Sequence, residues 1–518
     1  MQPNMAFKHL LLGAMILLSV SWCGASEAQN EQAQTGSRKT LNVGLYSEFV
    51  GFDIAKVRAF PPNMLIVAKA IMEPLFEYVY DGTSDTTGRI EPRLALTFEE
   101  APDRLSAIVH LRSGVKFHDG TTFDAQAVVS HYIRLLGPSL HLGLAETILK
   151  PLERVEAVDP LTVKFVLKRP WPSLQSALAI DQSMNLIGSP TALAKDPDGF
   201  NRHPVGTGPF VFHEWKTGDR LVVDRNPEYW DPALPKVDRV VYRIMPDGNT
   251  RYESLKAGEL DVMWTNDVGQ VNEARKNPDL VIHEFAGASG VGWIFNNSKP
   301  PFDDARVRAA VVHAFNSVAL AEVFFQGGAK PSHEFFPNSP WSCPDLKWRS
   351  FDPTEAKRLL KEVGKPIKVT LTGATTPDGR RMNSIAQQFM TEAGIDTKIE
   401  TIESSQIGAR AIRGDYEMLQ WLFRDVGGEP DLTFSQVTFI LTKYRVPEID
   451  TLIEQAHYNP DHEERRKIYC KVSQIFSDEA ILLLPVNTID YLIGRKTVVS
   501  LPSNQANMIR VRDAIMRE

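Results

Sequence analysis

A carboxylate directly after an apolar strand is the most informative chemical feature of this sequence. The stretch YEMLQWLFRDVGGEPDLTF (416–434) predicts an aromatic strand through Trp421 and Phe423 that ends abruptly at Asp425. Removing a carboxylate from water there is costly unless a cation pairs with it. The cation is either an arginine of the chain or a group that binds from outside. The arginines closest in sequence are Arg410, Arg413 and Arg424.

Common enzyme signatures are absent from the sequence. GASGVG (287–292) has Val291 where a nucleophile turn needs its second glycine, and His333-Glu334 is not followed by a second zinc-binding histidine. A phosphate-binding loop and a C-x-x-C pair are missing as well. The twelve histidines show no spacing typical of metal ligands. We therefore expect no catalysis, no cofactor and no metal.

HPVGTGPF (203–210) combines two prolines and two glycines and runs into FVFHEW, which alternates like a strand. A phosphate loop would open a helix instead, so that interpretation is excluded. Two interpretations remain: a rigid corner near the junction of lobes, which we favour because such residues fix backbone geometry first, or a main chain that contacts ligand.

The elements that must position these residues alternate between strands and helices. Periodicity predicts strands at 40–46, 106–112, 161–168, 210–215, 220–226 and 238–245. Amphipathic patterns with caps predict helices at 302–315 (capped by Asp303 or Asp304), 352–364, 382–394 and 461–477. This mixture indicates an α/β or α+β protein with several lobes, about three for a chain of 518 residues.

The first 28 residues are typical of a secretory signal. Lys8 precedes the apolar run 10–20, which is too short to span a bilayer, and small residues follow up to Ala28. A lipid anchor on Cys23 is a less favoured alternative because Trp22 stands where a small residue is usual. Residues 29–39 are expected to be a flexible lead-in. The formal net charge of −7, without a block of basic residues, disfavours nucleic acid as a partner.

Two cysteines, Cys343 and Cys470, remain after removal of the signal. An exported protein allows a disulfide between them, but their separation in sequence says nothing about distance. Paired and free thiols both stay open.

The order of motifs resembles the family 5 extracytoplasmic solute-binding proteins, the oligopeptide-, dipeptide- and nickel-binding components of bacterial ABC importers. The resemblance rests on HPVGTGPFVFHEWKTGDRLVVDRNPEYWD (203–231), preceded by EPRLALTFEEAPDRLSAIVHLRSGVKFHDGTTFDAQAVV (91–129) and followed by FNNSKPPFDDARVRAAVVHAFN (295–316). It covers nearly the whole mature chain.

The resemblance implies an α/β fold of the periplasmic-binding-protein type, with two lobes, three domains (class C) and a ligand cleft between the lobes. Lobe I would comprise 40–59, 186–282 and 486–518. An inserted domain II would comprise 60–185, and lobe III 283–485. The lobes would close over the ligand by hinge motion.

The resemblance also implies the site residues. Asp425, with Asp431 as second choice, would pair with the α-ammonium of a peptide. Main-chain groups of Glu48 and Val50 would bind the peptide as an added strand. Trp421, Phe423 and Arg424 would line the site, although the two aromatic residues are equally compatible with plain core.

The implied function is capture of a small solute in the periplasm, with a di- or oligopeptide as first choice, for delivery to the permease subunits of an ABC transporter. We expect a monomer. An opine, an oligosaccharide or a metal chelate is the alternative ligand, and a secreted hydrolase is the alternative of a different class.

Overall fold

The structure, a computed structural model, describes residues 38–57, 62–79, 88–137, 148–180, 183–337, 339–424, 430–500 and 509–517. Residues 1–39 and 40–518 form two separate units. The predicted signal segment 1–28, nearly all of the lead-in 29–39, and Asp425 lie outside the described residues. Apart from residues 38 and 39, all the described residues belong to the second unit.

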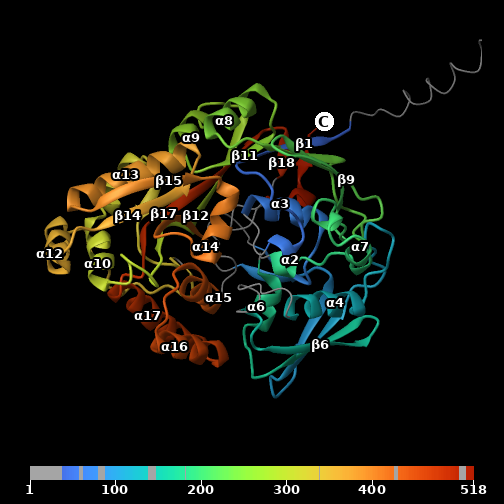
Figure 1. Ribbon diagram of the computed structural model, residues 1–518. Coiled ribbons are helices and arrows are strands. Elements are labelled where there is room, and N and C mark those ends of the chain that lie inside the picture. Colours follow the sequence, from blue (N-terminus) through green and yellow to red (C-terminus); the bar gives the residue numbers. More distant parts are fainter. Residues whose placement is uncertain are drawn as a thin grey trace, which may run out of the picture. The chain divides into compact units, whose positions relative to one another are not determined.

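An 11-stranded mixed sheet forms the centre of this unit (Figure 1). Its order is β15-β14-β16-β12-β17-β11-β1-β10-β9-β8, and β13 pairs separately with β17. The strands, in chain order, are β1 (Thr40–Leu45), β8 (Phe210–Lys216), β9 (Arg220–Arg225), β10 (Arg239–Ile244), β11 (Val262–Thr265), β12 (Leu280–Phe295), β13 (Ala329–Pro331), β14 (Lys368–Ala374), β15 (Asp396–Ile402), β16 (Met418–Arg424) and β17 (Leu482–Arg495).

The long strands β12 and β17 join the two parts of this sheet. The first half of β12 pairs with the part of β17 whose other edge pairs with β11. The second half of β12 pairs with both β17 and β16. The register between β12 and β17 shifts twice, between Ala286 and Ser289 and between Val291 and Trp293. The predicted domain boundaries at 282/283 and 485/486 both fall within these strands.

A second, four-stranded antiparallel sheet lies between β1 and β8 in the chain, with the order β4-β5-β7-β6. Its strands and the nearby short ones are β2 (Phe76–Val79), β3 (Arg89–Pro92), β4 (Ala95–Glu100), β5 (Ser106–Leu111), β6 (Leu152–Asp159) and β7 (Thr162–Leu167). Helices α4 (Ala125–Leu136) and α6 (Leu174–Ala179) share a core with this sheet, in which Tyr132, Phe165 and Trp171 are fully buried. The short strands β18 (Val498–Ser500) and β19 (Ile515–Met516) pair near the C-terminus.

Helices cover both faces of the main sheet, as the alternation along β16 requires. Met418 packs into one core, with Phe315 and Met390, whereas Leu419 and Phe423 pack into another. The remaining helices are α2 (Ile54–Val57), α3 (Pro62–Ile71), α7 (Pro190–Lys195), α8 (Gly248–Ala257), α9 (Val268–Ala274), α10 (Ala305–Ala314), α11 (Ser317–Val323), α12 (Pro353–Val363), α13 (Pro377–Ala393), α14 (Ile407–Arg413), α15 (Pro430–Ser435), the π-helix η6 (Gln436–Leu441), α16 (Pro447–Tyr458) and α17 (His462–Asp478).

The predicted strands and helices are confirmed, with small changes at their ends. Asp304, not Asp303, caps α10, because its carboxylate accepts a hydrogen bond from the main-chain N–H of Arg306. Gly364 ends α12 in the left-handed conformation, as its position predicted. Helix α13 begins at Pro377, five residues earlier than expected, because Thr376 provides the cap and Pro377 fits the first turn.

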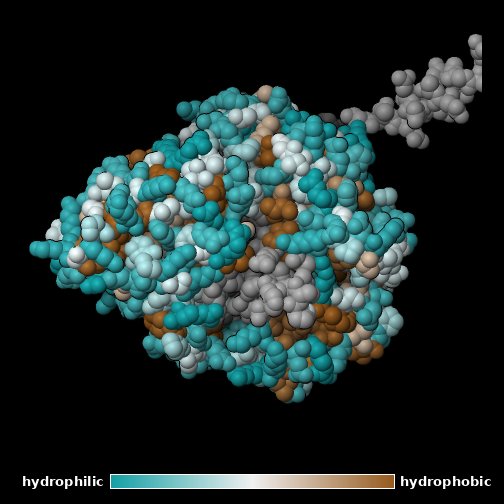
Figure 2. Space-filling model, in the orientation of Figure 1, coloured by the Kyte–Doolittle hydropathy of each residue, from teal (hydrophilic) through white to brown (hydrophobic). Residues whose placement is uncertain are grey.

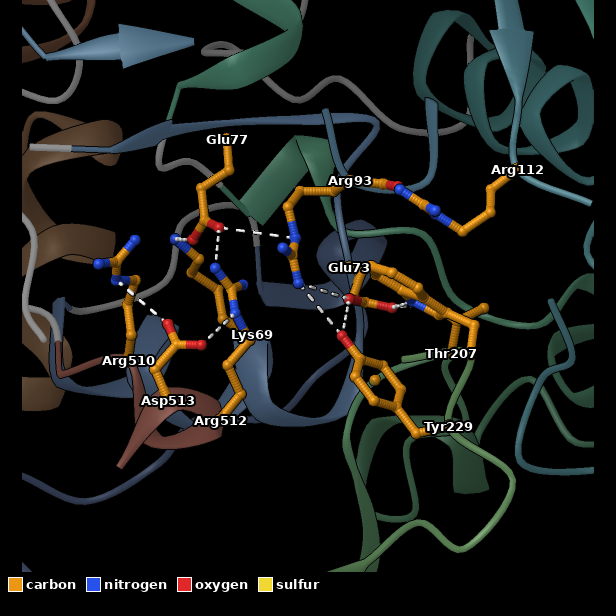
Figure 3. A network of polar contacts seen from close by, with 12 residues as sticks. Lys69, Glu73, Glu77, Arg93, Arg112, Thr207, Tyr229, Arg510, Arg512 and Asp513 are labelled. Carbon is orange, nitrogen blue, oxygen red and sulfur yellow. Dashed lines mark hydrogen bonds and ion pairs between the residues drawn. The ribbon is translucent and has the colours of Figure 1, made fainter. Parts of the chain in front are cut away.

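A buried network of charges connects the inserted segment to the rest of the unit (Figure 3). The carboxylate of Glu77 is fully buried and lies 2.6 Å from both Lys69 and Arg512, with Arg93 at 3.7 Å. Burial alone would raise the pKa of Glu77, but the charges of Arg512, Lys69 and Arg93 outweigh it and hold that pKa well below its ordinary value. The C-terminal Arg512 is thereby tied to strand β2.

The corner at 203–210 is held by the second carboxylate of this network, Glu73. Its oxygens accept hydrogen bonds from Thr207 (3.1 Å), Tyr229 (2.6 Å) and Trp230 (2.9 Å). The main chain of the corner also bonds to the protein, since Gly208 donates to the carbonyl of Ile71. These contacts support the interpretation of 203–210 as a structural corner.

Cys343 and Cys470 form a disulfide, with their Cα atoms 5.5 Å apart. It joins the segment after β13 to the middle of α17. The pairing that the sequence left open is therefore present.

The face in Figure 2 is largely hydrophilic, with apolar residues in scattered small groups, as is usual for a folded protein. Within the described part of the chain, none of the helices combines the length and the apolar character needed to cross a membrane.

Candidate ligand-binding site

The carboxyl ends of two strands point toward each other along the β12–β17 pair. Strand β11 ends at Thr265, which pairs with Tyr491 of β17. Strand β16 ends at Arg424, which pairs with Ser289 of β12, and Ser289 in turn pairs with Thr488 of β17. Both strands therefore end beside the same short stretch of β17. In α/β sheets, ligands bind beyond the carboxyl ends of strands where the topology changes, so this convergence marks the candidate site.

The carboxyl end of strand β1 lies at the same edge as that of β11, because the two strands run parallel. The segment that follows β1 is anchored to α3 through Ser47. Ser47 donates to the side chain of Asn63 at 2.9 Å, and the amide of Asn63 donates back to the carbonyl of Ser47 at 2.8 Å. The segment thus has a defined conformation before any ligand arrives.

The side chain of Glu48 is used within the protein. Its carboxylate accepts hydrogen bonds from the indole of Trp215 (3.2 Å), from the N–H of Phe49 (2.8 Å) and from the N–H of Gly218. These bonds hold the segment against the β8–β9 hairpin. The prediction for Glu48 and Val50 concerned only their main-chain groups; Val50 is half-buried, and within the described residues no hydrogen bond engages its main chain.

Phe423 and Trp421 project from the same face of β16 but differ in burial. Phe423 is buried and packs edge to face on Phe335, with ring centroids 5.8 Å apart, in a core that also contains Phe434 and Phe476. Trp421 is half-buried and packs against the edge of that core. Of the two aromatic candidates, Trp421 is the one with exposed surface.

The side chains of Arg424 and Asp431 and the whole of Asp425 lie outside the described residues. The arginines considered as internal partners of Asp425 are nevertheless informative. Arg410 bonds to the carboxylate of Glu400 at 2.6 and 2.7 Å. Arg413 bonds to Asp415 at 2.7 Å. Both guanidinium groups therefore already have a carboxylate partner.

The structure adds an aromatic pair that the sequence reasoning missed. Tyr46, just after β1, and Trp264, near the end of β11, lie with ring centroids 5.2 Å apart. Both are half-buried, and the indole N–H of Trp264 has no acceptor among the described residues. The available signal was that each residue lies at the carboxyl end of its strand.

Arg251, in α8, is nearly fully buried and interacts electrostatically with Tyr46. Its guanidinium donates to the carbonyls of Met245 (2.6 Å) and Pro246 (3.0 Å), which follow β10. Burial lowers the pKa of Arg251 to about 10, although the nearby Asp378 and Tyr46 oppose this shift. A cation therefore lies near the carboxyl ends of β1, β10 and β11. In the described part of the chain, no cluster of histidine, cysteine and carboxylate side chains is arranged to hold a metal ion.

Comparison with known proteins identifies the family. Residues 89–439 match the model of the bacterial extracellular solute-binding proteins, family 5, middle region. The chain belongs to this family. As a family 5 protein, it is the solute-binding component of an ABC importer, with the two-lobed α/β fold predicted from the sequence.

Individual relatives in family 5 cover most of the chain. It is 29% identical to the glutathione-binding protein GsiB of Shigella flexneri over 431 residues, which span 80% of this chain and 82% of GsiB. Among solved structures, DppA of Helicobacter pylori in complex with the peptide STSA has a TM-score of 0.85 and 24% identity, covering 95% of this chain and all of DppA. AgaA of A. tumefaciens R10, in complex with agropinic acid, has a TM-score of 0.83 and 24% identity, covering 92% of this chain and 99% of AgaA.

Proposed function

We propose that the solute is a short peptide, bound between the carboxyl ends of β1 and β11 on one side and of β16 on the other. The convergence of these strand ends beside Thr488 carries the proposal. An extended peptide placed there adds main-chain hydrogen bonds to both edges, which gives affinity without reading side chains.

The relatives favour peptides over other solutes. GsiB is named for glutathione, a tripeptide, and DppA holds the peptide STSA, whereas AgaA holds an opine, agropinic acid. The greater similarity in sequence is to the glutathione-binding protein. The opine is therefore the outcome against which the peptide must be tested.

Asp425 is the proposed partner of the peptide's α-ammonium group. Two findings support this role: β16 ends immediately before Asp425, and the candidate partners Arg410 and Arg413 are already paired with Glu400 and Asp415. Arg424, the third candidate partner, has its side chain outside the described residues. In a water-poor site, a carboxylate binds the cation of a ligand through a strong, charge-assisted bond.

Residues near the carboxyl ends of β1, β11 and β16 are candidates for further contacts with the peptide. We propose that the main chain at Glu48 and Val50 pairs with the peptide backbone, and that Trp421 and the Tyr46–Trp264 pair contact its side chains. Arg424 lies at the edge where the peptide would begin. Phe423 supports this edge from the core rather than by contact.

The long strands β12 and β17 offer the place for a hinge, because they join the two parts of the main sheet. We propose that lobe I (40–59, 186–282, 486–518) and lobe III (283–485) rotate about β12 and β17, where the register between the two strands shifts. Domain II (60–185) would move with lobe I, to which the Glu73–Glu77 network ties it. The protein would act in the periplasm as a monomer, after signal removal, without catalysing a reaction and without binding nucleic acid.

Native mass spectrometry of the protein purified from its producing cells tests the peptide proposal. We expect a co-purified peptide with a free amino terminus, displaced by glutathione or STSA when either is added in excess. Displacement by agropinic acid alone, or recovery of a sugar or chelate, would reject the peptide and leave the family assignment intact.

A further inference from the structure

The inserted domain II touches the opposite lobe at a point far along the chain from the strand edges of the proposed site. Three residues before and at the start of α6, Arg169, Trp171 and Ser173, meet residues of α16 and α17. These helices share the core of lobe III that contains Phe423. We call this set of contacts the joint.

The joint contains two buried contacts. The indole of Trp171 is fully buried and stacks on the imidazole of His457, with ring centroids 5.3 Å apart and planes 15° from parallel. The guanidinium of Arg465, 5% exposed, donates to the hydroxyl of Ser173 at 2.8 Å. Trp341 and Tyr469 flank the same guanidinium. Separating these surfaces would expose the large indole of Trp171 to water. It would also break the hydrogen bond between the guanidinium of Arg465 and the hydroxyl of Ser173.

A third contact is exposed and serves as an internal comparison. Arg169 and Glu454 form an ion pair of 2.7 Å, with 60% and 51% of their side chains exposed. Exposed ion pairs of this kind contribute little because water and salt screen them. The strength of the joint therefore comes from Trp171 and Ser173.

Domain II transmits this contact to lobe I because it is firmly attached there. Arg134 pairs with the buried Asp53 at 2.7 Å, and Ser189 donates to Asp119 at 2.6 Å. The Glu73–Glu77 network adds further buried bonds (Figure 3). Opening of the hinge at β12 and β17 would carry domain II away from α16 and α17 and break the joint.

We infer that Trp171, Ser173, His457 and Arg465 are positioning residues that set ligand affinity by holding domain II against lobe III in the closed arrangement, without contacting the ligand themselves. This inference rests on the proposed function as a binding protein with a hinge. The apparent affinity of such a protein scales with the fraction of molecules in the binding-competent arrangement, so loosening the joint weakens binding at a distance.

The test measures the closed fraction directly, without ligand, by pulsed electron paramagnetic resonance. Spin labels go on cysteines introduced at Val158 of domain II and Val323 of lobe III, both 58% exposed. In this background we compare S173A/H457A with R169A/E454A. Ser173 makes no capping hydrogen bond to α6, so its substitution removes the contact with Arg465 and leaves the helix intact.

The expected result is a larger population of longer distances in S173A/H457A than in the parent and in R169A/E454A. Restoring a hydroxyl with S173T should reduce it. For whichever of glutathione or STSA binds the parent, S173A/H457A should weaken binding about tenfold, mainly through faster dissociation. The single variant H457A, with the imidazole at a half-buried position, gives the same readout if the double variant folds poorly.

An unchanged distance distribution in both S173A/H457A and H457A would overturn the inference, whether or not glutathione or STSA binds the parent. If neither glutathione nor STSA binds the parent, the peptide proposal fails, and the distances alone decide whether the joint holds the closed arrangement.

Discussion

Gly206 lies so close to the main chain of Ile71 that a Cβ atom on Gly206 would stand 2.2 Å from the carbonyl oxygen of Ile71. A Cβ atom on the nearby Gly208 would stand 2.6–2.7 Å from the same carbonyl group. The glycines of the HPVGTGPF corner are thus required by close approach to the end of α3. Neither Gly206 nor Gly208 has a positive φ, so backbone conformation is not the reason for glycine at these positions.

Replacing Gly206 with alanine should lower the free energy of unfolding by about 1–3 kcal/mol, because the corner or the end of α3 must shift to admit the methyl group. Urea denaturation followed by circular dichroism measures this loss. Gly408→Ala is the matched control, since a Cβ at that helical position meets nothing within 4 Å. A loss no larger at Gly206 than at Gly408 would contradict the packing argument.

Glu77→Gln should lower the free energy of unfolding by about 3–5 kcal/mol at neutral pH, because it leaves Arg512, Lys69 and Arg93 buried without their counter-ion. The pH dependence has a definite sign. The folded pKa of Glu77 lies below its ordinary value of 4.5, so the unfolded chain binds more protons as pH falls. The stabilisation is therefore present above about pH 4.5 and lost as pH drops toward the folded pKa.

Urea denaturation of the parent and of Glu77→Gln between pH 3 and 7 checks this prediction, and the difference between them should shrink with acid. Glu91→Gln is the control, because the carboxylate of Glu91 forms an exposed pair with Arg89. A difference that stays constant with pH would mean that Glu77 is not the ionised centre of the network.

Asp425→Asn should weaken the binding of glutathione or STSA by about 2–5 kcal/mol, because the α-ammonium group would lose its charged partner in a site that excludes water. Isothermal titration calorimetry measures the change. Asp415→Asn is the control, because its carboxylate pairs with Arg413 at the surface. Equal dissociation constants for Asp425→Asn and the parent would transfer the role to Asp431.

Replacing both Cys343 and Cys470 with alanine should lower the free energy of unfolding by about 2–4 kcal/mol, since the disulfide closes a loop of 127 residues in the unfolded chain. Denaturation with and without a reducing agent provides the control: the reductant should destabilise the parent and leave the variant unchanged. A parent that is insensitive to complete reduction would show that the disulfide contributes nothing.

Local elements were readable from the sequence because each one carries its own signal. The strand at 161–168 alternates, and the helix at 352–364 has a cap, a first-turn proline and a closing glycine; the structure reproduces both as β7 and α12. The order of three motifs also indicated the family correctly. Each single signal is local, the longest motif being the 39 residues 91–129, so none of them needs knowledge of the fold.

Contacts between distant segments were not readable. Glu77 and Arg512 lie 435 residues apart in sequence, and the sequence around neither residue contains a pattern that predicts a buried ion pair. The disulfide was undecidable for the same reason. Phe423 looked equally like a pocket residue and a core residue, and only the position of Phe335 across from it distinguishes them. Tyr46 and Trp264 were overlooked because their meeting depends on the parallel pairing of β1 and β11.

Hydrogen exchange of the protein with and without saturating STSA or glutathione tests the central claim most directly. A peptide that bridges the two strand edges should slow exchange in the segment after β1, around Glu48 and Val50, and at the end of β16, around Trp421. Protection at both edges is the predicted result. Protection at only one edge, or at neither, would contradict a peptide bound between them.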